Sequence, residues 1–593
     1  MPPDPVGSSR KRQRIAPSTR PTYPRKRATQ ACHTCRQKRI KCDNEHPACG
    51  SCTNLGVQCI YRENDNSTFD PASIAILQRL ETLEELFRAA HPAVSETQTA
   101  TVAEPPSIVG PLNNLDSPAL ERKEPGAPYH INVETILGWS VFQNRGLKQT
   151  KSLRSLLKPQ SSDLEPPPRL LDFENSSARE LFRKFLEHVH AYNPVLEVEK
   201  IEQYIRDTLY DGIAWDARSC LLLLIFALGT ISGSSDSTHS ETSSDFRYSE
   251  EFSKAEEYFS AAQKRLGSLL CKNGVIEAQA FFYAGVYLMA TLRPFEAWRM
   301  FVQALACCET FDSHQPDAER GPEKDNIRRT IYWTCFKSEL ELRLELNVGR
   351  SCVLDLTYPA FFPSPPIGLK SEEEAVWYFY LAEIALRRLG NRILNHLYDQ
   401  NQRGNASDVE AILNFEDQAT GWLSSLPALL SLGDLWNPGS ADTEDTDSHS
   451  ALRFILTGHL IDCYEMMYWP FVVDAIHNTT LTTTPDFQAH HKNFARKGFD
   501  LCMLRILQNS PGFFDRHHGT WLMLRSCTRS ALVLIAGVLM GLEELLPPDW
   551  EGGVGKVLGL LRYWKDEAAD VADKLEILEW FMDNSSERPW NVV

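Results

Sequence analysis

Six cysteines near the start of the chain have the residue type and spacing of metal ligands. A C-x2-C-x6-C pattern occurs twice with an offset of 17 residues, and its members are Cys32, Cys35, Cys42, Cys49, Cys52 and Cys59. A C-x2-C turn directs two thiolates at one metal ion, and zinc takes four ligands in a tetrahedron. Six thiolates fill two tetrahedra only if two sulfurs are shared. The symmetry of the repeat predicts that the first cysteine of each half, Cys32 and Cys49, bridges two Zn2+ ions.

The repeat favours this arrangement over two others. Disulfides conflict with the reducing compartment that we expect, because the first residues lack the apolar core of a secretion signal. A single zinc site built from the two C-x2-C pairs would leave Cys42 and Cys59 without a role at matching positions. A segment of about 30 residues buries too little apolar surface to fold alone. Bound metal must therefore supply its stability, on the order of 10 kcal/mol or more.

The two halves of the repeat differ in charge. The insert of the first half, RQKRIK, carries Arg36, Lys38, Arg39 and Lys41, whereas the insert of the second half, TNLGVQ, carries no charge. Lys or Arg side chains read guanine edges in the major groove and also hold phosphates. We therefore expect only the first half to enter a nucleic-acid groove, with Arg36 and Lys41 on phosphates. The alternative is a solvated basic helix in a zinc module that binds proteins.

Positive charge is also concentrated at the start of the chain as a whole. Residues 1–62 hold 13 Lys or Arg and three Asp or Glu, although the chain has a net charge of −17. A basic head on an acidic body indicates that the head meets a polyanion, the alternative being a solubilising tail. Two basic clusters at the start also predict a two-part nuclear import signal or a phosphate-binding arm: Arg10, Lys11, Arg12 and Arg14, then Arg25, Lys26 and Arg27.

The rest of the chain is expected to be mostly α-helical. Apolar residues recur at helical spacing from about residue 171, in runs that include 519–545 and 555–582, and no alternating strand pattern emerges. No apolar run reaches the ~18 residues of a membrane span, so no membrane partner is expected. The predicted divisions are a disordered basic tail at 1–31, the cysteine domain at 32–59, a linker and dimerisation helix at 60–90, a mostly disordered linker at 91–170, and an all-helical regulatory domain at 171–593.

The segment 70–90 has the pattern of a short coiled coil. Its apolar residues fall at alternating steps of four and three: Ile76, Leu80, Leu83, Phe87 and Ala90. Such a seam pairs two parallel helices, so a homodimer through 70–90 is predicted. The seam spans only about two heptads, and a lone amphipathic helix packed on the body is the alternative.

The cysteine spacing resembles that of the fungal binuclear zinc cluster (Zn2Cys6) transcription factors, and Pro47, shortly before the fourth cysteine, fits the loop between their two halves. The body, from HVHAYNPVLEVEKIEQYI to IYWTCFKSELELRLEL, resembles their helical middle homology region. The resemblance implies a nuclear regulator of RNA polymerase II transcription that binds double-stranded DNA. It also implies that Lys38 and Arg39 contact bases of a CGG-type triplet, with dimer spacing setting the half-site separation.

The helical body carries no catalytic motif, so we expect no enzyme. It is expected to respond to a small-molecule effector or a partner, and to recruit the transcription machinery. An enzyme attached to a DNA-targeting head is the alternative and would need a deep polar pocket. The acidic and apolar segment 566–593 suits an activation segment or a docked helix. The pairs at 490–491 and 517–518 are expected to be surface histidines, and the other nine cysteines core thiols.

Overall fold

A computed structural model divides the chain into two compact units, residues 1–109 and 110–593, and each is described by itself. The structure describes residues 32, 34–35, 38, 40–43, 47–59, 131–143, 175–232, 243–311, 322–346, 348, 363–365, 371–403, 408–433, 435–436, 449–477 and 485–585. The predicted tail, import clusters and coiled-coil segment lie outside these residues.

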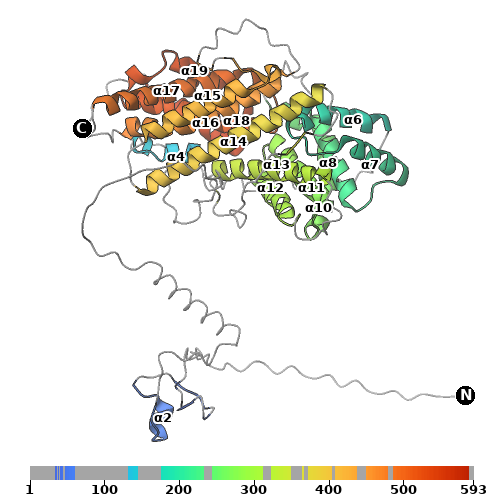
Figure 1. The fold of residues 1–593 in the computed structure, drawn as a ribbon, viewed down its shortest axis with the longest axis vertical. Helices are drawn as coiled ribbons and strands as arrows, with labels where there is room; N and C mark the ends of the chain where they lie inside the picture. Colours follow the sequence, from blue (N-terminus) through green and yellow to red (C-terminus); the bar gives the residue numbers. More distant parts are fainter. Residues whose placement is uncertain are drawn as a thin grey trace, which may run out of the picture. The chain divides into compact units, whose positions relative to one another are not determined.

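Every regular element among the described residues is a helix, which confirms the mostly α fold class (Figure 1). The first unit contains α2 (Gly50–Asn54). The second unit contains α4 (Val133–Leu137), α5 (Ser140–Gln143), α6 (Asn175–His188), η4 (His190–Tyr192), α7 (Val198–Asp211), α8 (Ala217–Ile231), α9 (Ser244–Arg247), α10 (Glu250–Leu269), α11 (Val275–Ala290), α12 (Pro294–Cys308), α13 (Pro322–Leu346), α14 (Ser371–Arg403), α15 (Val409–Ser425), η6 (Ala428–Leu430), α16 (Ser450–His477), α17 (Pro485–Asn509), η8 (Ser510–Gly512), α18 (Thr520–Leu539), η9 (Glu543–Leu545), α19 (Trp550–Trp564) and α20 (Ala569–Ser585).

Three apolar helices form the centre of the second unit. Nearly every residue of α8 and α11 is buried, as are most of those of α18. A helix that is apolar on all sides needs neighbours on all sides. Accordingly α8 packs against α6, α10 and α11, while α11 packs against α12 and α13. Asp216 caps α8 by accepting a hydrogen bond of 2.8 Å from the backbone of Ser219, which fixes where this helix begins.

Two glycines allow helices in this centre to approach closely. A Cβ at Gly229 of α8 would lie 2.1 Å from the backbone oxygen of Leu181 on α6. A Cβ at Gly285 of α11 would lie 2.5 Å from the ring of Phe301 on α12. Because real Cβ atoms do not come so close, these helix pairs are set by the absence of a side chain.

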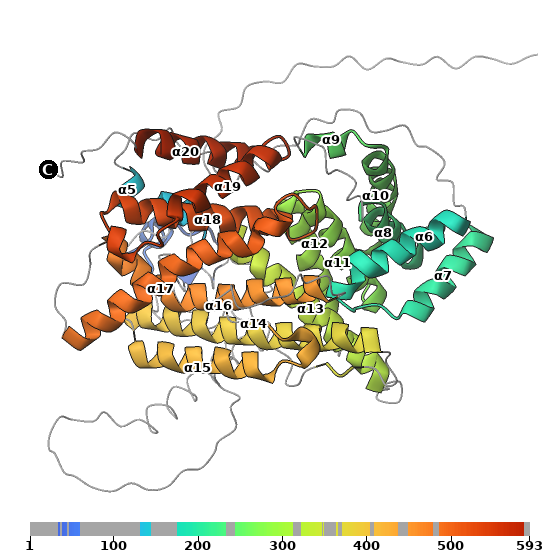
Figure 2. The same ribbon diagram turned by 90° about the horizontal axis from the view of Figure 1, so that it is seen from above.

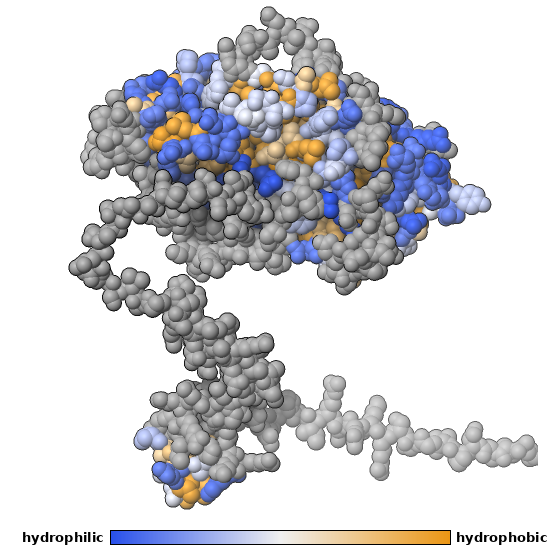
Figure 3. All heavy atoms as spheres, in the orientation of Figure 1, coloured by the Kyte–Doolittle hydropathy of each residue, from blue (hydrophilic) through white to orange (hydrophobic). Residues whose placement is uncertain are grey.

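Long helices flank the centre in a second group. Figure 2 shows α14 to α17 running alongside one another, and the contacts join α14 to α15 and α16, and α16 to α17. In the space-filling view the end formed by α6 and α7 is mainly hydrophilic (Figure 3). The last helix, α20, packs on α19 with Leu578 and Phe581 buried. The described part of the C-terminal segment is therefore a docked helix.

A chain of buried ion pairs attaches α4 to the body. Arg525 of α18 donates hydrogen bonds to both carboxylate oxygens of Glu134 and, at 2.7 Å, to Glu345 on α13. Arg529, one turn further along α18, binds Glu345 at 3.3 Å and Glu465 of α16 at 2.8 Å. The helices α4 and α5 lie within the range 91–170, for which the sequence predicts mostly linker.

The run 555–582, which the sequence suggests as one helical stretch, is two helices. The break between α19 and α20 contains Glu567, which is 1% exposed. Glu567 accepts hydrogen bonds from Arg247, at 2.7 Å, and from Arg516. Because these arginines come from distant segments, the periodicity of the run itself carries no sign of the break.

Although the sequence contains no uninterrupted apolar run of about 18 residues, the helix α18 is long enough and, on average, apolar enough to cross a bilayer. However, 78% of its most apolar stretch is buried inside the helical unit. It also carries Arg525 and Arg529, which are 3% and 7% exposed and bound to carboxylates. These are the features of a core helix.

The buried ion pairs predict that two arginines, each bound to two carboxylates, contribute differently to the free energy of unfolding. Arg525→Ala leaves Glu134 and Glu345 without their shared cation, so we expect a loss of about 3–5 kcal/mol in the free energy of unfolding. Arg183 binds Glu180 and Glu187 on the exposed face of α6, and Arg183→Ala is expected to cause no measurable loss. Urea unfolding of the full chain, followed by tryptophan fluorescence, measures both. Equal losses would contradict the importance of this buried chain.

Candidate metal centre and nucleic-acid interface

The six predicted ligand cysteines come together in the first unit. Cys32, Cys35, Cys49 and Cys52 are at most 1% exposed, Cys42 is 8% exposed, and Cys59 is partly exposed. Short separations join sulfurs from both halves of the repeat: 3.7 Å for Cys32 and Cys49, 3.5 Å for Cys35 and Cys49, and 3.6 Å for Cys32 and Cys52. The cluster thus joins the two halves of the repeat.

The sulfurs fall into two groups of four, in each of which all ligand atoms lie within 4.8 Å of one another. One group is Cys32, Cys35, Cys42 and Cys49, and the other is Cys32, Cys49, Cys52 and Cys59. Two ligands that are each 2.3 Å from a tetrahedral zinc ion are separated by about 3.8 Å. The donor set therefore fits two zinc ions, and Cys32 and Cys49 belong to both groups.

The two halves have the same local geometry. The backbone N–H of Cys35 donates to the sulfur of Cys32 at 3.3 Å, and the N–H of Cys52 donates to the sulfur of Cys49 at 3.4 Å. In both halves the first cysteine of the C-x2-C turn receives the backbone donor of the second. Cys49 is also the N-cap of α2. A donor directed at a sulfur stabilises negative charge on it, which suits a metal-bound thiolate.

Reciprocal hydrogen bonds join the halves. The hydroxyl of Thr34 donates to the backbone oxygen of Gln58 at 2.8 Å, and the hydroxyl of Ser51 donates to that of Lys41 at 2.7 Å. Thr34 and Ser51 are equivalent positions of the 17-residue repeat, as are Lys41 and Gln58. The unit therefore has an approximate internal twofold relationship, which the spacing of the cysteines already indicates.

The inserts that follow the C-x2-C turns also fold alike. The N–H of Ile40 donates to the oxygen of Cys35 at 3.0 Å, and the N–H of Val57 donates to that of Cys52 at 3.1 Å. In the second half Gly56 has a φ of 61°, a conformation that glycine adopts without strain. The backbone thus returns each insert to the third cysteine of its half.

Burial in this unit disfavours isolated negative charge on two of the sulfurs, those of Cys35 and Cys52. Burial, together with neighbouring thiols, raises the pKa of Cys52 to about 12 and raises that of Cys35 further. Divalent cations supply the positive charge that holds such sulfurs as thiolates. Four sulfurs per ion leave no open position for a reacting molecule, so the chemistry that the cluster supplies is structural.

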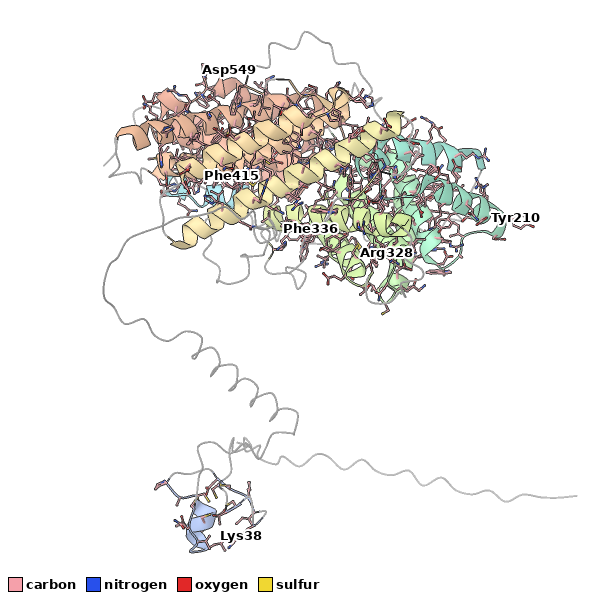
Figure 4. The ribbon with its side chains drawn as sticks, viewed as in Figure 1. Lys38, Tyr210, Arg328, Phe336, Phe415 and Asp549 are labelled. Carbon is pink, nitrogen blue, oxygen red and sulfur yellow. The ribbon has the colours of Figure 1, made fainter. Side chains whose placement is uncertain are left out.

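The predicted DNA-contacting residues are described in part. Lys38, labelled in Figure 4, and Lys41 are exposed on the insert of the first half. Their equivalents in the second half are Leu55, which is 54% exposed, and Gln58. The predicted contacts Arg36 and Arg39 lie outside the described residues. The same backbone turn thus presents cations in one half and neutral side chains in the other.

Two predictions about the second unit are wrong in part. Cys271 is exposed and is not a core thiol, although the other described cysteines of this unit are buried. His517 and His518 are half-buried where they line a cavity, and do not stand free on the surface. Burial lowers the pKa of each to about 4. Sequence spacing gives no sign of this burial, because the side chains that cover the pair come from other helices.

Comparison with known proteins identifies two domains in the chain. Residues 30–68 match the fungal Zn(2)-Cys(6) binuclear cluster domain. Residues 183–350 match the fungal specific transcription factor domain, which corresponds to α6 through α13.

Similar proteins carry the names of transcription factors. The chain is 24% identical to ecdB of Aspergillus rugulosus, a proposed transcription factor, over 79% of this chain and 83% of that protein. It is 21% identical to an uncharacterized transcriptional regulatory protein of Schizosaccharomyces pombe, over 68% of this chain and 57% of that protein. It is 41% identical to the transcription factor FBD3 of Fusarium pseudograminearum over 61 residues, which are 10% of this chain and 8% of that protein.

Removing zinc from the full chain with 1,10-phenanthroline is predicted to unfold the cysteine unit alone, because that unit has little apolar core beyond its sulfurs. Hydrogen exchange measured by mass spectrometry should show loss of protection in α2 and unchanged protection in α18, which serves as the internal control. Unchanged exchange in α2 after complete loss of zinc would contradict a metal-stabilised unit.

Proposed function

The chain belongs to the fungal Zn(2)-Cys(6) transcription factors, and we propose that it regulates RNA polymerase II genes by reading CGG-like triplets in the major groove. As a member of this family it is a transcription factor and not an enzyme. In the proposal the Zn2+ ions, with Cys32 and Cys49 as shared ligands, fix the cluster. Lys38 and Arg39 contact bases, while Arg36 and Lys41 hold phosphates.

The observation that carries the proposal is the contrast between two equivalent turns. Both are held by the same backbone hydrogen bonds, yet Lys38 stands where the other half has Leu55, and Lys41 stands where it has Gln58. If the positive charge served only solubility, we would not expect it to be confined to one half of the repeat. A cationic turn on a rigid metal cluster suits insertion between two phosphate backbones.

The remaining predictions complete the proposal. A homodimer formed through 70–90 would present two turns to DNA, because one triplet holds too little information to select a site in a genome. Basic residues at 10–14 and 25–27 would direct the protein to the nucleus. The proposed divisions are the tail at 1–31, the cluster at 32–59, the dimerisation segment at 60–90, the linker at 91–170, and a regulatory body at 171–593 that responds to an effector and recruits the transcription machinery.

The assignment of base and phosphate contacts predicts different effects for two lysines. Lys38→Gln should weaken binding to a CGG-containing duplex by about 1–3 kcal/mol and remove its preference over a scrambled duplex. Lys41→Gln should weaken binding to both duplexes equally and reduce the salt dependence by about one unit of slope. Leu55→Gln, at the position equivalent to Lys38, is the matched control and should change neither. Fluorescence anisotropy with the full zinc-loaded chain measures all three.

The proposal fails if Lys38→Gln reduces binding to both duplexes alike, or if Leu55→Gln has the same effect as Lys38→Gln. Unchanged DNA binding after neutralisation of both Lys38 and Arg39 would instead indicate a zinc module that binds proteins.

A further inference from the structure

The helical unit contains a large cavity that the proposed DNA contacts do not use. Its volume is about 1280 Å3, and its lining includes residues of α6, α8, α11 to α14, α16 to α18 and the 515–519 segment. Pockets that bind drug-sized molecules span about 300–1,000 Å3. The cavity is therefore large enough for a small molecule of that size or more.

One wall of the cavity is apolar. It includes Phe282, Val286 and Met289 of α11, Phe301 of α12, and Phe336 of α13, which is labelled in Figure 4. Each of these side chains is at most 9% exposed. A ligand that covers this wall gains from removing apolar surface from water.

Another part of the cavity lining is charged, and many of these charges are paired with one another. Six Lys or Arg and six Asp or Glu residues line the cavity. Lys337 of α13 donates to Glu383 of α14, and Arg387 binds Glu341 at 2.9 Å. His459 of α16 lies 3.4 Å from a carboxylate oxygen of Glu383.

Further charged residues of the cavity, on the helices α16 to α18, also form ion pairs with one another. Arg505 binds Asp462 at 2.9 Å and Glu465 at 2.7 Å, and Arg529 also binds Glu465. An anionic ligand that bound one of these arginines would leave the buried Glu465 with one cation where it now has two, and a cationic ligand would compete with the arginines for that carboxylate. Either exchange is costly in a buried site, so the wall favours a ligand without net charge.

On the side of α16 that lines the cavity, one position has no side chain. Phe454, Gly458 and Asp462 follow at four-residue steps and all line the cavity. A Cβ built on Gly458 meets no heavy atom within 4 Å, so the space above this glycine is open. The cavity thus extends to the backbone of α16 between Phe454 and Asp462.

We propose that this cavity binds a neutral, largely apolar small molecule, which covers the aromatic wall, occupies the open space at Gly458 and directs any polar groups at the paired charges. The inference rests on the proposed role of the helical body as the regulatory part of a transcription factor, and it gives that role a site and a ligand class.

Nile red, a neutral apolar fluorophore, tests the proposal on the full zinc-loaded chain. We expect saturable binding of one dye per chain by fluorescence titration. Gly458→Phe fills the open space and should weaken binding at least tenfold, while the smaller Gly458→Leu should weaken it less. Gly421→Phe, at an exposed helical glycine of α15 that also has open space, is the matched control and should bind within twofold of the parent chain. The sulfonated dye 1-anilinonaphthalene-8-sulfonate should bind at least tenfold more weakly than Nile red.

Equal Nile red binding by the parent chain and both Gly458 variants would overturn the proposal, as would tighter binding of the sulfonated dye. Thermal unfolding by circular dichroism identifies any variant that fails to fold, in which case the remaining Gly458 variant decides. DNA binding is measured on the same samples. Normal sequence preference without dye binding overturns this inference alone, whereas dye binding without sequence preference overturns the proposed function alone.

Discussion

Two tetrahedral metal ions and only six sulfur ligands impose the constraint on which the DNA-binding unit depends. Sharing two sulfurs joins what would be two separate C-x2-C loops into one body, and the residues common to both sulfur groups are Cys32 and Cys49. The reciprocal hydrogen bonds of Thr34 and Ser51 then fix the halves relative to one another. A unit with little apolar core thereby gains a rigid backbone on which Lys38 is presented.

The helical unit obtains its rigidity in a different way. Apolar helices such as α8 and α11 fill its centre, and buried ion pairs connect helices that are far apart in sequence. The same ion pairs form the charged wall of the cavity and continue through Glu345 to Arg525 and Glu134 on α4. The cavity and the first described helix of this unit thus share one network of buried charges, which provides a physical link between a bound molecule and α4.

The cysteine unit and the fold class were predictable because their signals are local. The 17-residue repeat contains the ligand types, their spacing and their equivalences, and apolar periodicity marks most helices. The break at Glu567 was missed because Arg247 and Arg516, which hold that residue, are distant in sequence. The cavity was missed for the same reason. Its walls come from many helices between α6 and α18, and the partial burial of His517 and His518 depends on tertiary packing that spacing does not encode.

The zinc content of the purified full chain, measured by elemental analysis against a calibrated protein concentration, tests the central claim most directly. The account predicts two zinc ions per chain, which six cysteines can bind only by sharing sulfurs. One zinc ion per chain would contradict it, because a single four-cysteine site needs no bridging ligand and leaves the matching third cysteines of the repeat unused.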